Sequence, residues 1–311
     1  MIETNLTITR RKFLAGAAAF AAGYSLARGG LGAEERTHAR RAIPSSGEKI
    51  PVIGMGTSRT FDAGTNRAAL DELAGVVRAF FDGGGTVIDS SPMYGTSEAV
   101  VGKLLEETGT KKSVFAATKV WIDGRDAGIG QMRRSMELIG VSVMDLMQIH
   151  NLRDWQAHLP VLRDWKRQGT IRYIGITTSH GRSHDELEKI MRSEQLDFVQ
   201  FSYSIEERAA EERLLPLAAD RGIAVLINRP FQRGDMFRKV KGTPLPGWSA
   251  EFDCASWGQF FLKFVVSHPA VTCAIPASSS ARHMGDNMGA GFGRMPDAAM
   301  RARMLKFYEA L

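Results

Sequence analysis

The sequence contains little cysteine and little proline. Among 311 residues there are two cysteines and 11 prolines. Cys254 and Cys273 could form at most one disulfide, which excludes a disulfide-stapled scaffold and a four-thiolate metal site. The hydrophobic share of 44% and the charged share of 24% are typical of an ordinary globular protein. Stability must therefore come from a large apolar core.

A strong excess of one charge sign is also missing. The formal net charge is +6, from 40 Lys and Arg against 34 Asp and Glu. Half of this excess lies in residues 1–33, where Arg10, Arg11, Lys12 and Arg28 stand against Glu3. The rest is dispersed along the chain, so no nucleic-acid partner is expected.

The N-terminal segment has the order of an export signal. Arg10 and Arg11 precede Lys12-Phe13-Leu14, and a weakly apolar run follows over residues 13–26. This run is shorter than the roughly 20 residues that a membrane-spanning helix needs. The paired arginines followed by Phe-Leu resemble a twin-arginine export signal, against the alternative of a chance pair beside an amphipathic helix.

This resemblance implies that the export machinery is a partner and that the protein is periplasmic or otherwise exported. Ala33 is a candidate end of the signal, and an uncleaved signal would leave the protein tethered to the membrane. We therefore divide the chain into a signal segment, residues 1–33, and one domain, residues 34–311.

Short apolar segments alternate with segments of helical periodicity throughout the larger part. Eight segments are strand candidates: Ile50–Gly54, Val87–Ile88, Val114–Thr118, Leu146–Ile149, Ile171–Ile176, Phe198–Phe201, Ala224–Ile227 and Val271–Ile275. Helical periodicity starts near Leu70, Val100, Ile129, Leu187 and Leu214. Gly140, Gly169 and Gly222 are expected to end helices, and Ser183 with Glu186 has the spacing of a capping box.

Strands that read as continuous apolar runs are typical of a parallel sheet covered by helices. Eight repeats in this length predict an α/β fold, a single-domain (β/α)8 TIM barrel. A doubly wound sheet is the alternative, but Gly54-Met55-Gly56 lacks the third glycine of a dinucleotide fingerprint. The long stretch from Pro230 to Ala255 shows little periodicity and is expected to be a loop over the barrel mouth.

Three ionisable residues each close an apolar strand candidate: Asp89, Lys119 and His150. The C-terminal ends of barrel strands form the mouth where active sites are built, so adjacent strands should bring these side chains together. Tyr94, five residues after Asp89, is expected on the same rim. Taken singly, each residue could be structural, but four such residues at one rim favour a catalytic site.

The chemistry of this set fits reduction of a carbonyl group. A phenol has a pKa of about 10 and donates a proton poorly near neutrality unless a cation lowers that pKa. We expect Lys119 to be that cation, Asp89 to be its counter-ion, and His150 to hydrogen-bond the substrate oxygen. An acid placed beside the oxygen can protonate the oxyanion that develops as hydride arrives.

Several blocks of the sequence resemble the aldo-keto reductase family. They span nearly the whole chain after about Arg41: residues 50–57 (IPVIGMGT), 87–95 (VIDSSPMYG), 118–121 (TKVW), 145–150 (DLMQIH) and 257–276. The resemblance implies a catalytic tetrad of Asp89, Tyr94, Lys119 and His150, with Tyr94 as general acid or base. It also implies a nicotinamide cofactor bound without a Rossmann domain, NADPH by family habit and NADH as the alternative.

The resemblance also implies where the cofactor and the substrate bind. Thr177, Thr178 and Gln200 would meet the carboxamide, while Asn228 stands where an aromatic residue often stacks on the nicotinamide, a role left to Phe231 or Tyr203. The expected cofactor residues are Gly56, Thr57, Asp89, Thr177, Thr178, Gln200, Asn228, Ser278, Ser280, Arg282, His283 and Asn287. Ala277 replaces a frequent lysine of the phosphate site, which Arg282 would offset.

The substrate is expected to be a small carbonyl compound that contacts Met93 and Trp121. With Trp248 and Phe252 in the long loop, an apolar or aromatic aldehyde or ketone is favoured. Trp257 is expected to pack structurally, because it begins a helix-like run. No metal site is expected, since no paired Cys or His spacing is present.

Two other functions remain open. One is a catalytically idle, reductase-like subunit that binds nucleotide. The other is a different barrel enzyme, such as a metal-dependent hydrolase.

Overall fold

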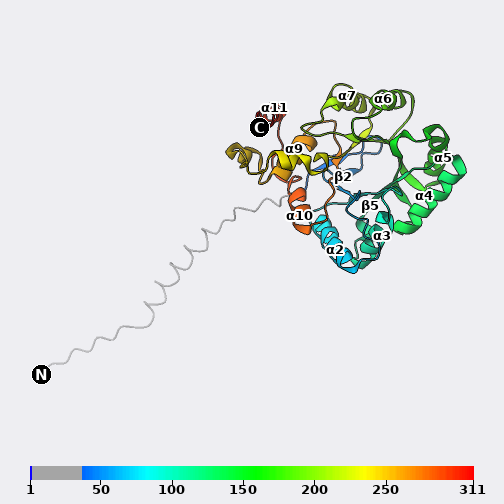
Figure 1. Ribbon diagram of the computed structural model, residues 1–311, viewed down its shortest axis with the longest axis horizontal. Coiled ribbons are helices and arrows are strands. Elements are labelled where there is room, and N and C mark those ends of the chain that lie inside the picture. Colours follow the sequence, from blue (N-terminus) through cyan, green and yellow to red (C-terminus); the bar gives the residue numbers. More distant parts are fainter. Residues whose placement is uncertain (2–36) are drawn as a thin grey trace. The chain divides into compact units, whose positions relative to one another are not determined.

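The computed structural model describes Met1 and residues 37–311 (Figure 1). The chain divides into two units, Met1–Thr37 and His38–Leu311, and all elements named below belong to the second. Apart from Met1, the expected signal segment lies outside the described residues. In the described part of the chain, no helix is long and apolar enough to span a membrane.

Eight parallel strands form one sheet in chain order, from β3 to β10. Backbone bridges from Ile53 to Ala274 and from Gly56 to Ala277 join the first strand to the last. The sheet is thereby closed into a (β/α)8 barrel, as the sequence predicts. The strands are β3 (Met55–Gly56), β4 (Val87–Asp89), β5 (Phe115–Val120), β6 (Met144–Ile149), β7 (Ile171–Thr177), β8 (Phe198–Ser202), β9 (Ala224–Asn228) and β10 (Cys273–Ala274).

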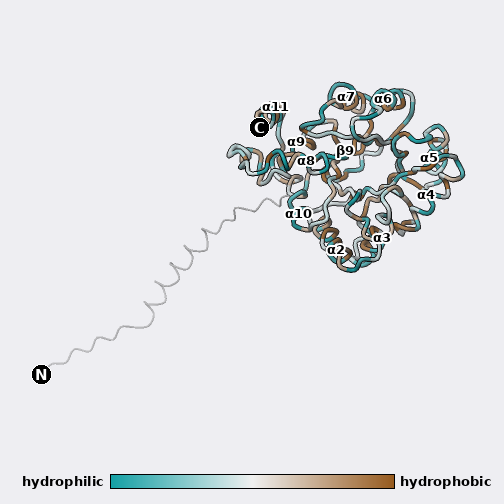
Figure 2. Tube along the Cα trace, in the orientation of Figure 1, coloured by the Kyte–Doolittle hydropathy of each residue, from teal (hydrophilic) through white to brown (hydrophobic). Residues whose placement is uncertain are grey.

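Helices surround the barrel (Figure 1). Hydrophobic and hydrophilic residues alternate along these helices in Figure 2, as expected for helices that cover a sheet on one face. The helices are α2 (Arg67–Asp82), α3 (Ser97–Glu107), α4 (Arg125–Ile139), α5 (Trp155–Gln168), α6 (His184–Ser193), α7 (Leu214–Arg221), α8 (Asp235–Lys239), α9 (Trp257–Val266), α10 (Ala281–Gly289) and α11 (Ala298–Glu309). Each of α2 to α7 connects one strand to the next, α8 and α9 lie between β9 and β10, and α10 and α11 follow the last strand.

The first strand candidate, Ile50–Gly54, is only partly correct. Its first half lies in β2 (Lys49–Pro51), which pairs antiparallel with β1 (Arg40–Ala42) in a separate two-stranded sheet. The barrel strand β3 begins later, at Met55. The apolar run is continuous across both strands because both are buried, so periodicity could not separate them.

The barrel has two apolar cores, one on each face of its sheet. The inner core consists of side chains that point into the barrel, including Val87, Phe115, Leu146 and Phe198, while a larger core lies between the strands and the helices. Because side chains alternate along a strand, Asp89 points inward two residues after Val87. The inner core thus carries a polar layer above it, at the C-terminal end of the strands.

Some local expectations need correction. Helix α5 was not anticipated as a periodic segment; it contains Pro160 five residues from its start. Ser183 adopts a left-handed backbone and its side chain makes no capping bond, so the predicted capping box is wrong. Gly140, Gly169 and Gly222 end their helices in the left-handed conformation, which confirms that prediction.

The segment from Pro230 to Ala255 is more structured than expected. It contains α8 and two 3₁₀ helices, Gln232–Gly234 and Gly247–Phe252. Trp248 does not face the barrel mouth; its ring lies 6.0 Å from Phe260 of α9 and 5.7 Å from Phe307 of α11. The second half of the segment is therefore packed against helices.

Helices α3 and α4 approach so closely at Gly102 that a side chain does not fit. An ideal Cβ there would lie 2.1 Å from the carbonyl oxygen of Leu138, which belongs to a backbone that cannot yield easily. We expect Gly102→Ala to lower the free energy of unfolding by about 2 kcal/mol, as in overpacked cores. Urea denaturation measures this change.

Gly130 of α4 is the matched control, because an added Cβ there meets nothing within 4 Å. We expect Gly130→Ala to raise stability by about 0.5–1 kcal/mol, since alanine is the better helix former. Equal effects of the two substitutions would contradict the close contact at Gly102.

Candidate active site

A cavity of about 490 Å³ lies at the C-terminal end of the barrel strands. Most of the residues expected from the sequence line it: Gly56, Thr57, Asp89, Met93, Tyr94, His150, Thr177, Thr178, Gln200 and Asn228. They come from the ends of six strands, β3, β4, β6, β7, β8 and β9, or from the segments that follow them. The structure thus brings together residues separated by up to 172 positions in the sequence.

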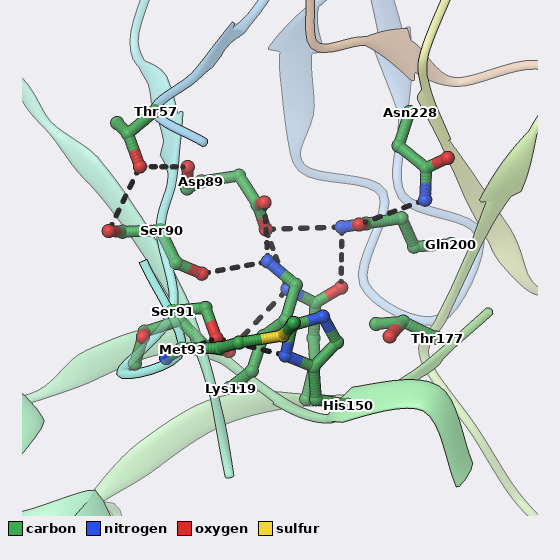
Figure 3. Close-up of polar contacts among 12 residues, drawn as sticks. Thr57, Asp89, Ser90, Ser91, Met93, Lys119, His150, Thr177, Gln200 and Asn228 are labelled. Atoms are coloured by element: carbon green, nitrogen blue, oxygen red, sulfur yellow. Dashed lines mark hydrogen bonds and ion pairs between the residues drawn. The ribbon is translucent and has the colours of Figure 1, made fainter. Parts of the chain in front are cut away.

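Lys119 and Asp89 form a buried ion pair beside this cavity. Lys119 Nζ lies 2.6 Å from Asp89 Oδ2, and the two side chains are 0% and 3% exposed. The ammonium also donates to the backbone carbonyl of Ser90 at 2.7 Å (Figure 3). Burial alone would lower the pKa of Lys119, but the interactions with Asp89 and Tyr94 together outweigh it and the net pKa is raised. Lys119 therefore stays charged.

Tyr94 is held over this pair by a tight turn. Its backbone N–H donates to the carbonyl of Ser91, and its own carbonyl accepts a 2.7 Å bond from the Ser97 hydroxyl. Gly95 then continues with a φ of +62°, a conformation that favours glycine. Lys119 Nζ lies 5.2 Å from the centroid of the Tyr94 ring.

The pKa of Tyr94 moves in the opposite direction from the one expected. Burial of the phenol raises its pKa above the usual value, although the charge of Lys119 acts to lower it. Desolvation wins because the phenolate would lose more hydration than one ammonium can replace. Tyr94 is therefore a neutral phenol at physiological pH, which is the form that can donate a proton.

His150 lies between two aromatic rings at the start of a 3₁₀ helix, His150–Leu152. Its ring meets the ring of Tyr94 edge-on, with centroids 5.8 Å apart, and the ring of Trp121 at 6.3 Å. Burial, together with the charge of Lys119, lowers the pKa of His150 to about 3. The imidazole is therefore neutral.

A chain of buried amides extends from Asp89 across the barrel. Gln148 and Gln200 each donate to Asp89 Oδ1, at 2.8 and 3.1 Å, and Gln200 also donates to Gln148 (Figure 3). Asn228 donates to Gln200 at 3.3 Å. Gly175 makes room for this chain, because a Cβ there would lie 2.7 Å from Gln148. Sequence reasoning missed Gln148, although it directly precedes Ile149-His150 on a buried strand.

The expected carboxamide residues carry one unsatisfied group. Thr177 Oγ1 accepts the backbone N–H of Asn151, and Asn228 donates to the carbonyl of Thr178. The hydroxyl of Thr178 is buried and has no partner among residues 37–311. A buried hydroxyl without a partner is costly, which points to a ligand at this place.

The residues expected at the cofactor phosphate lie outside the cavity lining, at the start of α10. Ser280 caps this helix through a bond from the backbone N–H of His283. Ser278 is buried and bonded to Ser280, Arg282 and His283 are exposed side by side, and Asn287 is buried one and a half turns later. The lining itself reaches Ala277, just before this segment.

The expected substrate residues are placed differently from one another. Met93 lines the cavity and is 47% exposed. Trp121 is absent from the residues of the described chain that line the cavity and instead packs beside His150, with the guanidinium of Arg153 over its ring. Phe231 lines the cavity, whereas Tyr203 is fully buried elsewhere and cannot stack on a ligand there.

The aromatic residues of the long segment also lie away from the cavity. Phe252 is buried against Trp248, and Trp257 donates to the carbonyl of Thr243 and packs on Phe260. The structural role expected for Trp257 is thus observed, while the prediction that Trp248 and Phe252 contribute to the substrate pocket is wrong.

Sequence reasoning missed an arginine cluster at the cavity mouth, which we define as Arg59, Arg182, Arg229 and Arg233. These four residues follow β3, β7 and β9. Burial, and after it the charges of these arginines, lowers the pKa of His180 to about 4. The signal in the sequence was their position in the segments that follow strand ends. The net charge of the chain does not reveal such a local cluster.

Arg229 is the least satisfied member of the arginine cluster. Its Nη2 donates to Gln232, but Nε and Nη1 are buried and have no partner among residues 37–311. Burial and the neighbouring Arg233 lower its pKa. Two buried guanidinium donors without acceptors indicate that this wall of the cavity is built for an anion. In the same range, no group of three or more His, Cys, Asp or Glu could hold a metal ion.

Two curated reductases are similar to this chain in sequence. The aldo-keto reductase YhdN of Bacillus subtilis (strain 168) is 29% identical over 216 residues, which cover 64% of this chain and 64% of that protein. Methylglyoxal reductase YeaE of Escherichia coli (strain K12) is 27% identical over 256 residues, 80% of this chain and 88% of that protein. The chain thus spans less than two thirds of the length of the first relative.

Solved structures show the same fold. An aldo-keto reductase from Klebsiella pneumoniae, solved in complex with NADPH, superposes with a TM-score of 0.70 at 21% identity, over 87% of this chain and 95% of that chain. The model of the aldo/keto reductase family matches residues 52–254, which is more than half of the sequence. The chain therefore belongs to the aldo/keto reductase family.

Proposed function

We propose that the protein reduces an aldehyde or a ketone to the alcohol by hydride transfer from NADPH, with Tyr94 as the general acid. NADH is the alternative donor. The observation that carries this proposal is the buried Lys119–Asp89 pair next to Tyr94 and His150 at the cavity. A neutral phenol beside a fixed cation can release a proton because the cation stabilises the phenolate that remains.

The roles of the four side chains follow from their geometry. The bound nucleotide supplies the hydride that adds to the carbonyl carbon. His150 donates a hydrogen bond to the carbonyl oxygen and sets its direction, and Tyr94 transfers its phenolic proton to that oxygen as negative charge develops there. Lys119 stabilises the phenolate, and Asp89 keeps Lys119 in place. The products are the alcohol and the oxidised nucleotide, with Tyr94 regaining a proton from solvent.

Residues of the cavity fit a nicotinamide dinucleotide. The unsatisfied hydroxyl of Thr178, with Gln200 and Asn228, would hold the carboxamide through hydrogen bonds. The arginine cluster would hold the pyrophosphate, since guanidinium groups pair with phosphate oxygens in a bidentate way. These two places contain the buried groups that have no partner among residues 37–311, the Thr178 hydroxyl and Nε and Nη1 of Arg229.

The choice between NADPH and NADH depends on the segment at the start of α10. Ser278 and Ser280, the exposed Arg282 and His283, and Asn287 are the candidates for a 2′-phosphate. Arg282 supplies a permanent positive charge there, which favours NADPH. An Escherichia coli relative, 28% identical over 193 residues, is named an NADH-specific methylglyoxal reductase, so NADH stays the alternative.

The proposed substrate is a small carbonyl compound. Met93, Phe231 and Phe237 supply apolar surface to the cavity. The name of the relative YeaE, a methylglyoxal reductase, supports a small aldehyde or ketone. The alternative of a catalytically idle, nucleotide-binding subunit is disfavoured. A site without catalysis has no use for a buried ion pair, because both of its charges are costly to desolvate.

The role of Tyr94 is testable with one hydroxyl deletion. We expect Tyr94→Phe to lower kcat for carbonyl reduction by a factor of about 10²–10⁴, the usual contribution of a general acid, with the Kd for NADPH unchanged. Steady-state kinetics and a fluorescence titration measure the two quantities. Tyr173→Phe is the control, because that hydroxyl bonds to Ser46 and Glu48, outside the cavity lining. Wild-type turnover of Tyr94→Phe would remove Tyr94 as the acid.

Removal of the cation should affect both activity and stability. We expect Lys119→Met to abolish reduction and to lower the free energy of unfolding by about 3–5 kcal/mol, because it strands the buried Asp89 charge. The double variant Asp89→Asn with Lys119→Met should recover much of the stability and none of the activity. Thermal unfolding and kinetics test both statements, and an active single variant would contradict the role of Lys119.

The arginine cluster should contribute to nucleotide affinity. We expect Arg229→Gln to raise the Kd for NADPH about 10-fold, which corresponds to about 1.4 kcal/mol, and to weaken the salt dependence of binding. Titration of tryptophan fluorescence at low and high salt measures this change. Arg238→Gln is the matched control, since Arg238 pairs with Asp235 at the surface. Equal affinities of the two variants would exclude the pyrophosphate from this wall.

For the N-terminal segment we propose a twin-arginine export signal. The support is the order Arg10-Arg11, Phe13-Leu14 and a short weakly apolar run. The export machinery is then a partner, and the protein is periplasmic or otherwise exported, with a membrane tether if the signal is uncleaved. Because this pathway carries folded proteins, the reductase would leave the cytoplasm with its nucleotide already bound.

Replacement of Arg10 and Arg11 by lysine tests the signal while preserving the charge. We expect the double variant to remain in the cytoplasm, since the pathway reads the arginine pair itself. Cell fractionation with immunoblotting measures the distribution. Unchanged delivery to the periplasm would reject the proposal.

A further inference from the structure

Ser91 contacts His150, the histidine of the candidate active site, at the ring nitrogen Nδ1. Its Oγ lies 2.9 Å from His150 Nδ1, and Ser91 is completely buried. The same oxygen accepts the backbone N–H of Met93 at 3.2 Å. Ser91 therefore belongs to the turn that carries Tyr94, and it ties this turn to His150.

The direction of the bond between Ser91 and His150 follows from the count of donors and acceptors. A serine hydroxyl has one hydrogen to donate and two lone pairs. One lone pair is used by the Met93 N–H. Among residues 37–311 the structure gives the Ser91 hydroxyl no acceptor other than His150 Nδ1. If Nδ1 carried the proton, the buried hydroxyl hydrogen would have no acceptor, which is costly.

We infer that Ser91 is a positioning residue that donates to His150 Nδ1 and so keeps the proton of the neutral imidazole on Nε2. Because Nδ1 is bonded to the buried Ser91 and His150 lines the cavity, Nε2 is the ring nitrogen left to donate to the carbonyl oxygen. The inference rests on the proposed carbonyl reduction and names a residue that this reaction uses indirectly. It explains how His150 can act as a donor without being charged.

The surroundings of His150 support a neutral, oriented ring. Lys119 is the charged group close to it and opposes a second positive charge, and burial acts in the same direction on its pKa. The rings of Tyr94 and Trp121 pack against the imidazole at interplanar angles of 90° and 57°, which limits its rotation. With Ser91 bonded to Nδ1, both the ring plane and the tautomer are determined.

The tautomer can be measured directly in the wild-type protein. In ¹⁵N-labelled enzyme with NADP⁺ bound, two-dimensional NMR of the imidazole nitrogens distinguishes a protonated from an unprotonated nitrogen. His150→Asn assigns the signals. We expect a protonated Nε2 and an unprotonated Nδ1 that do not change between about pH 6 and pH 9. A protonated Nδ1 would overturn the inference, and this measurement needs no turnover.

Kinetics of Ser91→Ala provide the second test. We expect kcat to fall about 10-fold or more, because the hydrogen bond to the developing oxyanion is strongest in the transition state, and the Kd for NADPH to stay unchanged. The NMR spectrum of this variant should show a mixture of tautomers or loss of the bonded Nδ1 signal. Ser135→Ala is the matched control, since Ser135 is a buried serine whose hydroxyl donates to Glu98 and not to His150.

The outcomes separate the inference from the proposed function. A wild-type kcat and an unchanged spectrum in Ser91→Ala would overturn the role of Ser91. If the wild-type enzyme reduced no carbonyl compound while His150 kept its proton on Nε2, the proposed function would fail and the positioning of the imidazole would stand.

Discussion

The ion pair between Lys119 and Asp89 is the interaction on which the site depends. Two opposite charges buried in a barrel are costly to desolvate, and the cost is offset only when every donor and acceptor of the pair is satisfied. Here Asp89 accepts from Lys119 and from the amides of Gln148 and Gln200, and Lys119 donates to the carbonyl of Ser90 as well. The pair therefore requires the closed barrel, because its partners come from four separate strands.

The register of the sheet explains why these residues meet. Asp89 of β4 pairs with Ala117 of β5, and Lys119 pairs with Gln148 of β6. Side chains alternate along a strand, so Asp89 and Lys119, which is two residues beyond Ala117, point into the barrel together. A shift of one residue in either strand would turn one member of the pair toward the helices and separate it from its partner. The apolar inner core below them fixes that register.

Much of this arrangement could be predicted from the sequence, because buried barrel strands are continuous apolar runs and the catalytic residues lie where those runs end. Asp89, Lys119 and His150 were found in this way. The division between β2 and β3 could not be found, since both are buried and read as one run. The arginine cluster was missed for a different reason: Arg59, Arg182, Arg229 and Arg233 lie on three loops whose convergence depends on barrel closure. The substrate contact of Trp121 stays a prediction, because its ring packs beside His150 and outside the cavity lining, and proximity in sequence to Lys119 does not show which way the side chain faces.

The distribution of charge in the site follows a physical logic. Inside the barrel the cation Lys119 is matched by one carboxylate, and the amides of Gln148, Gln200 and Asn228 carry hydrogen bonds onward without adding charge. At the mouth, by contrast, the arginine cluster brings four guanidinium groups together, only partly offset by Glu207 and Asp235 near Arg229, and Arg229 leaves two buried donors unpaired. Such an excess persists in a stable fold only if the repulsion is small against the total stability or if an anion relieves it. Binding of an anionic nucleotide would therefore neutralise the mouth, and it would do so without disturbing the separately neutralised pair that assists Tyr94.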